Sequence, residues 1–117
     1  MSSIMYLIET TVKEENKAAA LELIDCLVAS TKKEEGAVDY HWSINGDKIN
    51  IIEHYADNAA TKLHLDGFAV NFGEYFSNLF DVHSCTVYGD PNAEVKEILD
   101  GFGAVYMTTV NGFVNSK

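Results

Sequence analysis

Residues 38–55, VDYHWSINGDKINIIEHY, form two runs in which apolar and polar residues alternate, on either side of an Asn-Gly pair. Asn-Gly between such runs is the strongest short-range indication of a β-hairpin, because both residues accept the positive φ angles of a tight two-residue turn. We therefore predict two antiparallel strands joined by Asn45 and Gly46.

This loop assigns a face to every side chain of the hairpin. One face carries the aromatic residues, with the cross-strand pairs Trp42 and Ile49, Tyr40 and Ile51, and Val38 and Glu53. The opposite face is more polar and carries His41, Ser43, Asn50, Ile52 and His54. The sequence leaves open which of the two faces meets the helices.

The segments before the hairpin predict a strand and a helix. Residues 4–12 are apolar at both alternating sets of positions up to Glu9, which is typical of a strand covered on both faces. Residues 14–34 then change to a helical period, with apolar residues on one side and charged residues elsewhere. Gly36 fits the C-terminal stop of this helix.

The segment after the hairpin predicts a helix in two parts. Asp57 or Asn58 caps its start, and Gly67 loosens it. The second part carries an aromatic stripe at helical spacing, formed by Phe68, Phe72, Phe76, Leu79 and Phe80. Such a stripe is either core packing or one wall of a ligand site.

The last third of the chain predicts a strand over residues 83–90, a short helix and a final strand over residues 104–113. Asp90 is the expected N-cap of the helix, with Pro91 at its first position and Gly101 or Gly103 at its end. The element order is therefore β-α-β-β-α-β followed by an added α-β unit. The first six elements are the split β-α-β arrangement of ferredoxin-like α+β folds. We expect the added unit to cover a sheet edge or to extend a subunit contact.

Composition restricts the class of protein and its partners. At 117 residues the chain is expected to form one domain, residues 1–117. The net charge is −10 and all eight basic residues are lysines, so neither nucleic acid nor an anionic membrane surface is an expected partner. No apolar run approaches the roughly 20 residues of a membrane helix, and the first residues do not resemble a leader, so we expect a cytoplasmic protein. Cys26 and Cys85 have no short Cys-x-x-Cys spacing and are expected to be buried free thiols.

Three segments together resemble a known family: EEGAVDYHWS at residues 34–43, the Asn-Gly hairpin, and IIEHYADNAATKLHLDGFAVNF at residues 51–72. This spacing resembles the antibiotic biosynthesis monooxygenase superfamily, in which Glu-x-aromatic ends a strand and a helix His follows about nine residues after the aromatic. Glu53, Tyr55 and His64 occupy those positions, and Gly36 with Tyr40 fits the preceding segment. The resemblance covers about residues 4–88, whereas residues 89–114 lie outside the usual minimal domain.

The resemblance implies a homodimeric α+β barrel, in which the sheet of one ferredoxin-like protomer packs on that of a second and each subunit has a pocket between helices and sheet. Activities in the superfamily include cofactor-independent oxidation of electron-rich aromatic compounds to quinones, haem degradation, and turnover of signalling quinones. This sequence departs from the quinone-forming members in having no Arg. It departs from the haem-degrading members in having Glu9 and Thr10 where they use a first-strand Asn, so haem is not expected.

His64 and Glu53 are the candidate catalytic residues. A histidine titrates near neutral pH, which suits the removal of a proton from a phenol, and Glu53 among aromatic side chains could assist as a second base. The alternatives are structural: His64 would hold the helix against the strand end, and Glu53 would accept hydrogen bonds from backbone amides or a Tyr hydroxyl.

Aromatic residues and one histidine complete the expected substrate-binding set, which consists of Tyr55, Trp42, Tyr40, His54 and Phe72. The aromatic members are either a stacking surface for a flat ligand or part of the core of the dimeric barrel. No metal site is expected. With the predicted loop, His41 faces Asn50 and His54 lies four residues further along, about 13 Å away, which is too far to share an ion with it.

Two functions follow from these observations and the resemblance. The first is a homodimeric oxygenase that needs no cofactor and acts on a planar phenolic or quinonoid small molecule, with His64 as the base. The second, from a different class, is a non-catalytic dimeric module that binds a metabolite or a protein partner, with the aromatic residues serving only as core.

Overall fold

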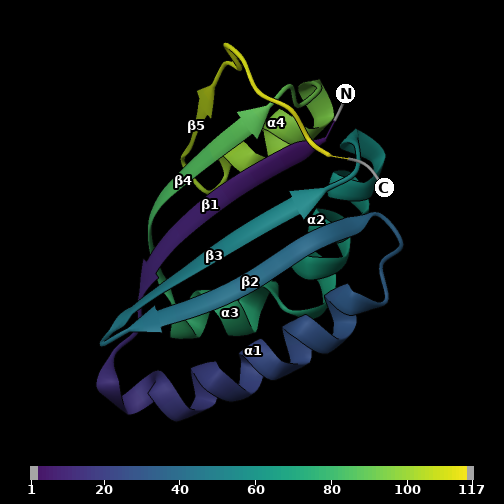
Figure 1. Ribbon diagram of the computed structural model, residues 1–117. Helices are drawn as coiled ribbons and strands as arrows, with labels where there is room; N and C mark the ends of the chain where they lie inside the picture. Colours follow the sequence, from purple (N-terminus) through teal and green to yellow (C-terminus); the bar gives the residue numbers. More distant parts are fainter. Residues whose placement is uncertain (1–2, 116–117) are drawn as a thin grey trace.

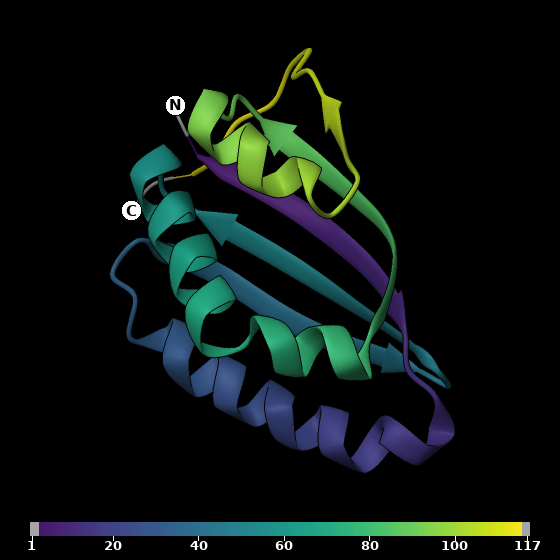
Figure 2. The same ribbon diagram turned by 180° about the vertical axis from the view of Figure 1, so that it is seen from behind.

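The computed structural model describes residues 3–115, which form a five-stranded sheet with all helices on one face (Figures 1 and 2). The strands are β1 (Ile4–Thr11), β2 (Ala37–Asn45), β3 (Lys48–Tyr55), β4 (Asp81–Gly89) and β5 (Ala104–Met107). The helices are α1 (Lys17–Lys32), α2 (Asn58–Asn71), α3 (Gly73–Leu79) and α4 (Ala93–Asp100), with a short 3₁₀ turn (Glu14–Asn16) before α1. The strand order is β2-β3-β1-β4-β5, antiparallel except for the parallel pair of β4 and β5. The predicted ferredoxin-like α+β fold with an added α-β unit is confirmed.

The hairpin forms as predicted, but its loop is one residue further along. Asn45 pairs with Lys48, so the loop residues are Gly46 and Asp47. Gly46 has φ 66°, and within residues 3–115 only glycines have a positive φ, so Asp47 does not, which is the pattern of a type II′ turn with glycine first. Trp42 therefore lies opposite Ile51 instead of Ile49. Because each partner moves by two positions, residues 39–45 keep their predicted faces, but a β-bulge between Ala37 and Asp39 leaves Val38, predicted to face Glu53, without a cross-strand partner and 53% exposed.

The aromatic face of the hairpin is the one that meets the helices. The core lies between this face and the helix layer, and it includes alternate residues of the two central strands: Ile4, Tyr6 and Ile8 of β1, and Ile49, Ile51 and Tyr55 of β3. Phe76 and Phe80 of the predicted aromatic stripe are buried there and stack with ring centroids 4.7 Å apart. The core interpretation of the stripe therefore holds for these two residues.

Helix boundaries differ from the predictions for local reasons. Gly67 does not loosen α2, which continues to Asn71 and breaks at Phe72, where the backbone leaves the helical region. The N-cap of α4 is Asn92 instead of Asp90, because the Asn92 side chain accepts a hydrogen bond from the Val95 N–H. At the start of α2, the Asp57 side chain accepts a bond from the Ala60 N–H at 2.8 Å, as predicted for a cap.

Gly36 has a different purpose from the predicted helix stop. Helix α1 ends at Lys32, and Gly36 lies in the turn before β2, where a Cβ atom would overlap the Cβ of Ala60 in α2. The Gly36 carbonyl also accepts a hydrogen bond from the Ala56 N–H at 2.9 Å. This close approach holds the turn after α1 against the first residues of α2.

The second face of the sheet is only partly covered. Residues 108–115 cross it near the ends of β4 and β1 (Figures 1 and 2). Large apolar side chains remain exposed on it, including Met5, Ile52 and Tyr88. The first strand was predicted to be covered on both faces. Within one chain, only the face toward the helices is fully covered.

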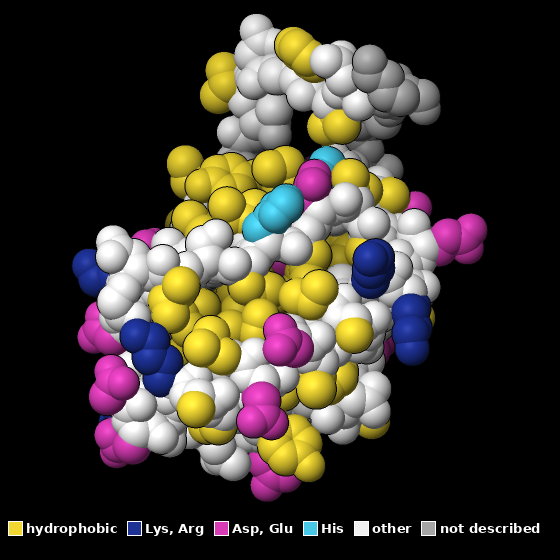
Figure 3. Space-filling model, turned by 60° about the horizontal axis from the view of Figure 1, so that its bottom comes forward, with side chains coloured by type: hydrophobic (Ala, Val, Ile, Leu, Met, Phe, Trp, Pro, Cys, Tyr) yellow, Lys and Arg dark blue, Asp and Glu magenta, His cyan; other side chains and the backbone are white. Residues whose placement is uncertain are grey.

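The expectations from composition concern basic patches, membrane-spanning helices and the two cysteines. The lysines do not gather into a basic patch on the face seen in Figure 3, where apolar side chains lie near the centre. Within residues 3–115, no helix has the length and apolar character that crossing a membrane requires. Both cysteines are free, but only Cys85 is buried, because Cys26 lies on the outer side of α1.

Candidate functional site

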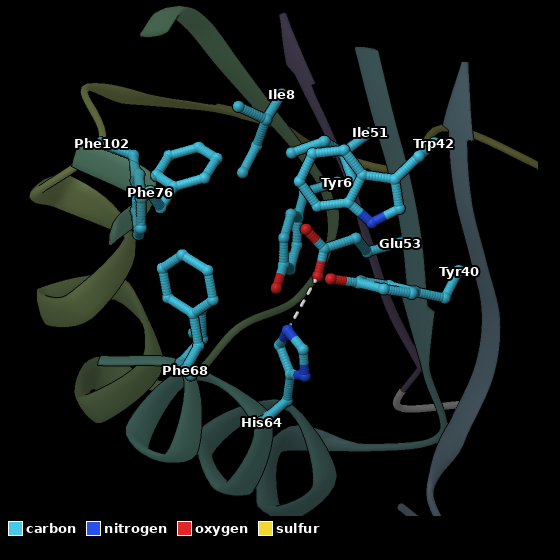
Figure 4. A pocket seen from close by; sticks show the side chains of 11 residues that line it. Tyr6, Ile8, Tyr40, Trp42, Ile51, Glu53, His64, Phe68, Phe76 and Phe102 are labelled. Atoms are coloured by element: carbon cyan, nitrogen blue, oxygen red, sulfur yellow. Dashed lines mark ion pairs between the residues drawn. The ribbon is translucent and has the colours of Figure 1, made fainter. Parts of the chain in front are cut away.

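A cavity lies between the sheet and the helices, with an aromatic wall (Figure 4). It is lined by Tyr6, Ile8, Tyr40, Trp42, Ile51, Glu53, His64, Leu65, Phe68, Phe76 and Phe102. Its volume is about 300 Å³ including the open mouth. Most of this space consists of narrow gaps between side chains, and the part wide enough for solvent holds about one water molecule.

A buried carboxylate and imidazole form the polar end of the cavity. The Nε2 atom of His64 lies 3.2 Å from Oε1 of Glu53, and both side chains are 5% exposed. On its other side, Nδ1 of His64 lies 3.0 Å from Oε1 of Glu34, whose side chain is 21% exposed. His64 thus connects a buried carboxylate with one that reaches solvent.

One oxygen of the Glu53 carboxylate is hydrogen-bonded within the core, and the other is free. The Tyr55 hydroxyl donates to Oε1 at 2.6 Å, and the Tyr55 ring stacks on the His64 ring with centroids 4.9 Å apart. The other carboxylate oxygen, Oε2, points into the cavity (Figure 4) and receives no hydrogen bond from residues 3–115. Both nitrogens of His64 face carboxylates, so Glu53 is the member of the pair with an oxygen free for a ligand.

Local sequence explains how these groups meet. Glu53 and Tyr55 are two residues apart on β3 and therefore share the helix-facing side. The Asp57 cap starts α2 directly after that strand, which places His64 two turns into the helix and above Glu53. The contact between Gly36 and Ala60 holds the residues that follow α1 close to α2. Glu34, one of these residues, therefore lies on the side of the His64 ring opposite Glu53.

The electrostatics favour a protonated His64. Burial by itself lowers the pKa of His64, but the hydrogen bond and negative charge of Glu53, with those of Glu34, outweigh it and raise the pKa above its ordinary value of 6.5. Burial, followed by the charge of Glu53, also raises the pKa of Tyr6 and of Tyr55 far above 10.0. Both phenols therefore remain neutral hydrogen-bond donors at physiological pH.

The raised pKa of His64 predicts how stability depends on pH. The folded state binds this proton more tightly than the unfolded state, so the contribution is fully present below pH 6.5 and is lost as pH rises through the folded pKa. We expect the free energy of unfolding to fall over this range in the wild type and to change less in His64→Gln. Urea titrations at several pH values measure this difference. His41→Gln, on an exposed side chain of β2, is the control, and an unchanged slope in His64→Gln would contradict the assignment.

The structure brings together some of the predicted site residues and separates others. Tyr40 and Trp42 line the cavity with His64 and Glu53, whereas Tyr55 lies behind Glu53 as its hydrogen-bond donor. Phe72 lines a separate outer groove between α1 and α2, which His64 and Phe68 also border. His54 follows Glu53 on β3 and therefore points to the other face of the sheet, so it does not reach the cavity.

His54 and His41 instead lie near Asp39. Nδ1 of His54 is 3.5 Å from one Asp39 oxygen, and Nε2 of His41 is 3.4 Å from the other. Among residues 3–115, no three His, Cys, Asp or Glu side chains are grouped so that they could hold a metal ion.

Sequence reasoning missed Glu34 and Tyr6. Glu34 is one of several carboxylates at the end of a charged helix, and nothing local distinguishes it from its neighbours. Tyr6 could have been found, because a Tyr in a central apolar strand needs a hydrogen-bond partner when it is buried.

Fold and site together define a small α+β domain with a buried carboxylate-imidazole pair at the end of an aromatic cavity. The chain belongs to the antibiotic biosynthesis monooxygenase family, whose model matches residues 3–70. Among curated proteins, none matches this sequence.

Solved structures with the same fold are distant in sequence. MupZ from Pseudomonas fluorescens is 20% identical, with 98% of this chain and 96% of that chain covered and a TM-score of 0.82. Rv0793 from Mycobacterium tuberculosis is 19% identical, with 78% and 97% covered and a TM-score of 0.68. SnoaB, a cofactor-independent oxygenase from Streptomyces nogalater, is 13% identical, with 80% and 97% covered and a TM-score of 0.65. The likeness to MupZ spans nearly the whole chain, whereas the other two match about four fifths of it.

Proposed function

We propose that this protein is a cofactor-independent monooxygenase that acts on a planar phenolic or quinonoid molecule. The observation that carries the proposal is the Glu53–His64 pair, which is buried and has one free carboxylate oxygen directed into an aromatic cavity. Membership of the monooxygenase family and the shared fold with SnoaB support the same class of reaction.

The first step is removal of the phenolic proton. A phenol has a pKa of about 10, so at neutral pH it needs a nearby base. Glu53 accepts the proton on its free oxygen, and His64 stabilises the pair by sharing a proton with Glu53 on one side and Glu34 on the other. Glu53 and neutral His64 take up one proton together, so the negative charges that raise the pKa of His64 make the pair a stronger base and bring its pKa closer to that of the phenol.

The second step uses the electron-rich anion itself as reductant. The anion transfers one electron to O₂, and the two radicals combine to form a carbon–oxygen bond at a conjugated ring carbon that carries one hydrogen in the phenolic tautomer and two in the keto tautomer. The proton held by the pair returns to the peroxide, and the remaining C–H proton is lost as the O–O bond breaks, so that water leaves and a ring carbonyl remains. Relative to the keto tautomer, the CH₂ group supplies all four electrons, so one oxygen atom enters the product and the other leaves as water. The aromatic walls keep bulk water from the intermediates.

Substrate entry requires movement of side chains. A planar two-ring molecule does not fit in space for about one water molecule, so the aromatic residues have to move apart on binding. Phe68 and His64 separate the cavity from the outer groove and are the side chains whose rotation would join the two spaces. The narrowness of the cavity also supports a second candidate function. In this alternative the protein is a non-catalytic binding module, and the aromatic side chains serve only as core.

We further propose that two copies pair through the second face of the sheet. Exposed Met5, Ile52 and Tyr88 would then be covered, as the double-sided apolar pattern of the first strand requires. The negative charge of the chain makes nucleic acid an unsuitable partner.

The proposal is tested by turnover under ¹⁸O₂ with a metal chelator present, followed by mass spectrometry of products from naphthols, anthrones and hydroquinones. A monooxygenase incorporates one labelled atom into each product molecule. Release of labelled hydrogen peroxide without incorporation would indicate an oxidase and overturn the monooxygenase assignment.

Glu34 is expected to act as a positioning residue for His64. In Glu34→Gln the ring loses one of its two neighbouring charges, so the pKa of His64 falls and the rising limb of the activity–pH profile moves to lower pH. The maximal rate is also expected to fall, because Glu53 and His64 together are then a weaker base. Glu35→Gln, one residue further from the α1 end, is the matched control. A profile that does not move in Glu34→Gln would contradict this role.

A further inference from the structure

A second hollow, here called the side hollow, adjoins the cavity and opens to solvent. Its volume is about 640 Å³ including its mouth, and it is lined by Phe76, Ser77, Phe80, Val82, Gly101 and Phe102. Phe76 and Phe102 line the cavity as well, so these two rings separate the two spaces. Figure 4 shows both rings across the cavity from Glu53. The side hollow therefore extends the cavity in the direction away from its polar end.

The two separating rings are held with different firmness. Phe76 is 4% exposed, stacks on Phe80 with centroids 4.7 Å apart, and meets the edge of Phe68 at 5.3 Å. Phe102 is half-buried, and its one aromatic contact among residues 3–115 is with Phe68, at 6.4 Å between centroids. Movement of Phe102 therefore breaks fewer contacts than movement of Phe76.

The local sequence Gly101-Phe102-Gly103 leaves the Phe102 ring free to rotate. The backbone N–H groups of these three residues donate to carbonyls of the last residues of α4, at 2.9 to 3.1 Å. Gly103 has φ 74°, a conformation that favours glycine. The backbone of this turn is thus fixed, while neither neighbour of Phe102 has a side chain that obstructs its ring. Rotation about the side-chain bonds can move the ring without opening the turn.

We propose that Phe102 determines which ligands the protein accepts: its ring rotates outward on binding, and the side hollow takes an apolar arm of the ligand. The inference rests on the proposed function, because it places the ligand hydroxyl at Glu53, across the cavity from Phe102. The ligand class that it specifies is a phenol whose ring carries an extended apolar arm opposite the hydroxyl.

The chemistry of the side hollow selects an apolar arm. Its side chains are aromatic or aliphatic except for Ser77, and the Ser77 hydroxyl already donates to the Gly73 carbonyl at 2.9 Å. A polar arm would lose hydrogen bonds to water there and find no side-chain partner in exchange. Each CH₂ group of an alkyl arm, in contrast, gains about fourfold in affinity when it is buried.

The small size of the closed cavity gives Phe102 its importance. The cavity has room for about one water molecule, so a phenol ring binds only if part of the wall moves. Phe102 moves without disturbing the Glu53–His64 pair, which is held by β3 and α2. It comes from the added α-β unit, outside residues 3–70 that the family model matches. The unit that extends the sheet thus also supplies one wall of the cavity.

Two ligands with the same phenol ring test the inference: 4-ethylphenol and 4-pentylphenol, whose alkyl chains differ by three CH₂ groups. Binding is measured by calorimetry without oxygen, so that no turnover occurs. We expect the wild type to bind 4-pentylphenol about tenfold or more tightly than 4-ethylphenol, since complete burial of the three groups would give about 60-fold.

Ser77→Phe fills the side hollow from the exposed side of α3 and leaves the cavity unchanged. It should lower the ratio of the two affinities by about threefold or more, through weaker binding of 4-pentylphenol alone. Asn78→Phe is the matched control, because Asn78 is the next residue, is also exposed, and does not line the side hollow. Circular dichroism verifies folding of both variants.

Phe102→Ala tests the role of the ring itself. The short ligand loses a wall of its site, whereas the long ligand no longer has to displace the ring, so the affinity ratio should rise above that of the wild type. Equal weakening of both ligands would assign Phe102 to the core and overturn its role as a determinant.

A smaller affinity ratio than expected in the wild type, an unchanged ratio in Ser77→Phe, or an equal fall in Asn78→Phe would overturn the inference. So would the absence of binding by both phenols. Failure of the proposed function has a different signature: the ratio and its dependence on residue 77 are as expected, and no oxygen is consumed when air is admitted.

Discussion

Glu53→Gln is expected to lower kcat/KM by about 10² to 10⁴, the contribution that a positioned general base makes to a proton transfer. The amide has nearly the same size as the carboxylate and can still accept the hydrogen bond from Tyr55, so the fold should be retained. It cannot take a proton from a phenol. Steady-state oxygen consumption, with circular dichroism to verify folding, measures the effect.

The matched control for this substitution is Glu22→Gln, which makes the same chemical change on the exposed side of α1. It should leave turnover within about twofold. Wild-type activity in Glu53→Gln would show that Glu53 only holds Tyr55 and His64 in place, and the base would have to be sought elsewhere.

Gly36→Ala is expected to destabilise the protein by about 1–3 kcal/mol, the usual consequence of inserting a methyl group where there is no room. The new Cβ would overlap that of Ala60 and push the turn that follows α1 away from α2. Because Glu34 lies two residues before Gly36, its contact with His64 should loosen as well. The free energy of unfolding in urea measures the first effect, and the pKa of His64 by NMR measures the second.

Gly67→Ala is the control for Gly36→Ala, because a Cβ at Gly67 meets nothing within 4 Å and the residue lies inside α2. There alanine should stabilise by about 0.5–1 kcal/mol through its higher helix propensity. Adding Ala60→Gly should restore part of the stability lost in Gly36→Ala. If Gly36→Ala were as stable as the wild type, the close approach of the two segments would not be needed.

Much of the fold could be predicted because local chemistry determines it. The tight turn at Gly46, the alternation of residues 48–55 and the Asp57 cap each act over a few residues, and together they produce the order of strands and helices. The errors are also local: Gly46 took the first loop position, and the Asn92 side chain capped α4 in place of Asp90.

The candidate site was harder to predict from the sequence, because it depends on contacts between distant segments. Glu53, Tyr55 and His64 could be selected from their spacing, but Glu34 reaches His64 only through the packing of Gly36 on Ala60. His54 entered the predicted site because the sequence does not say which hairpin face meets the helices.

The most direct test is oxygen consumption by the purified wild-type protein across naphthols, anthrones and hydroquinones, with a chelator present and with Glu53→Gln measured beside it. We predict uptake above the uncatalysed rate with at least one conjugated hydroxyaryl compound, and loss of that uptake in the folded variant. Uptake no faster than the uncatalysed rate with every compound would contradict the oxygenase assignment and favour the binding module.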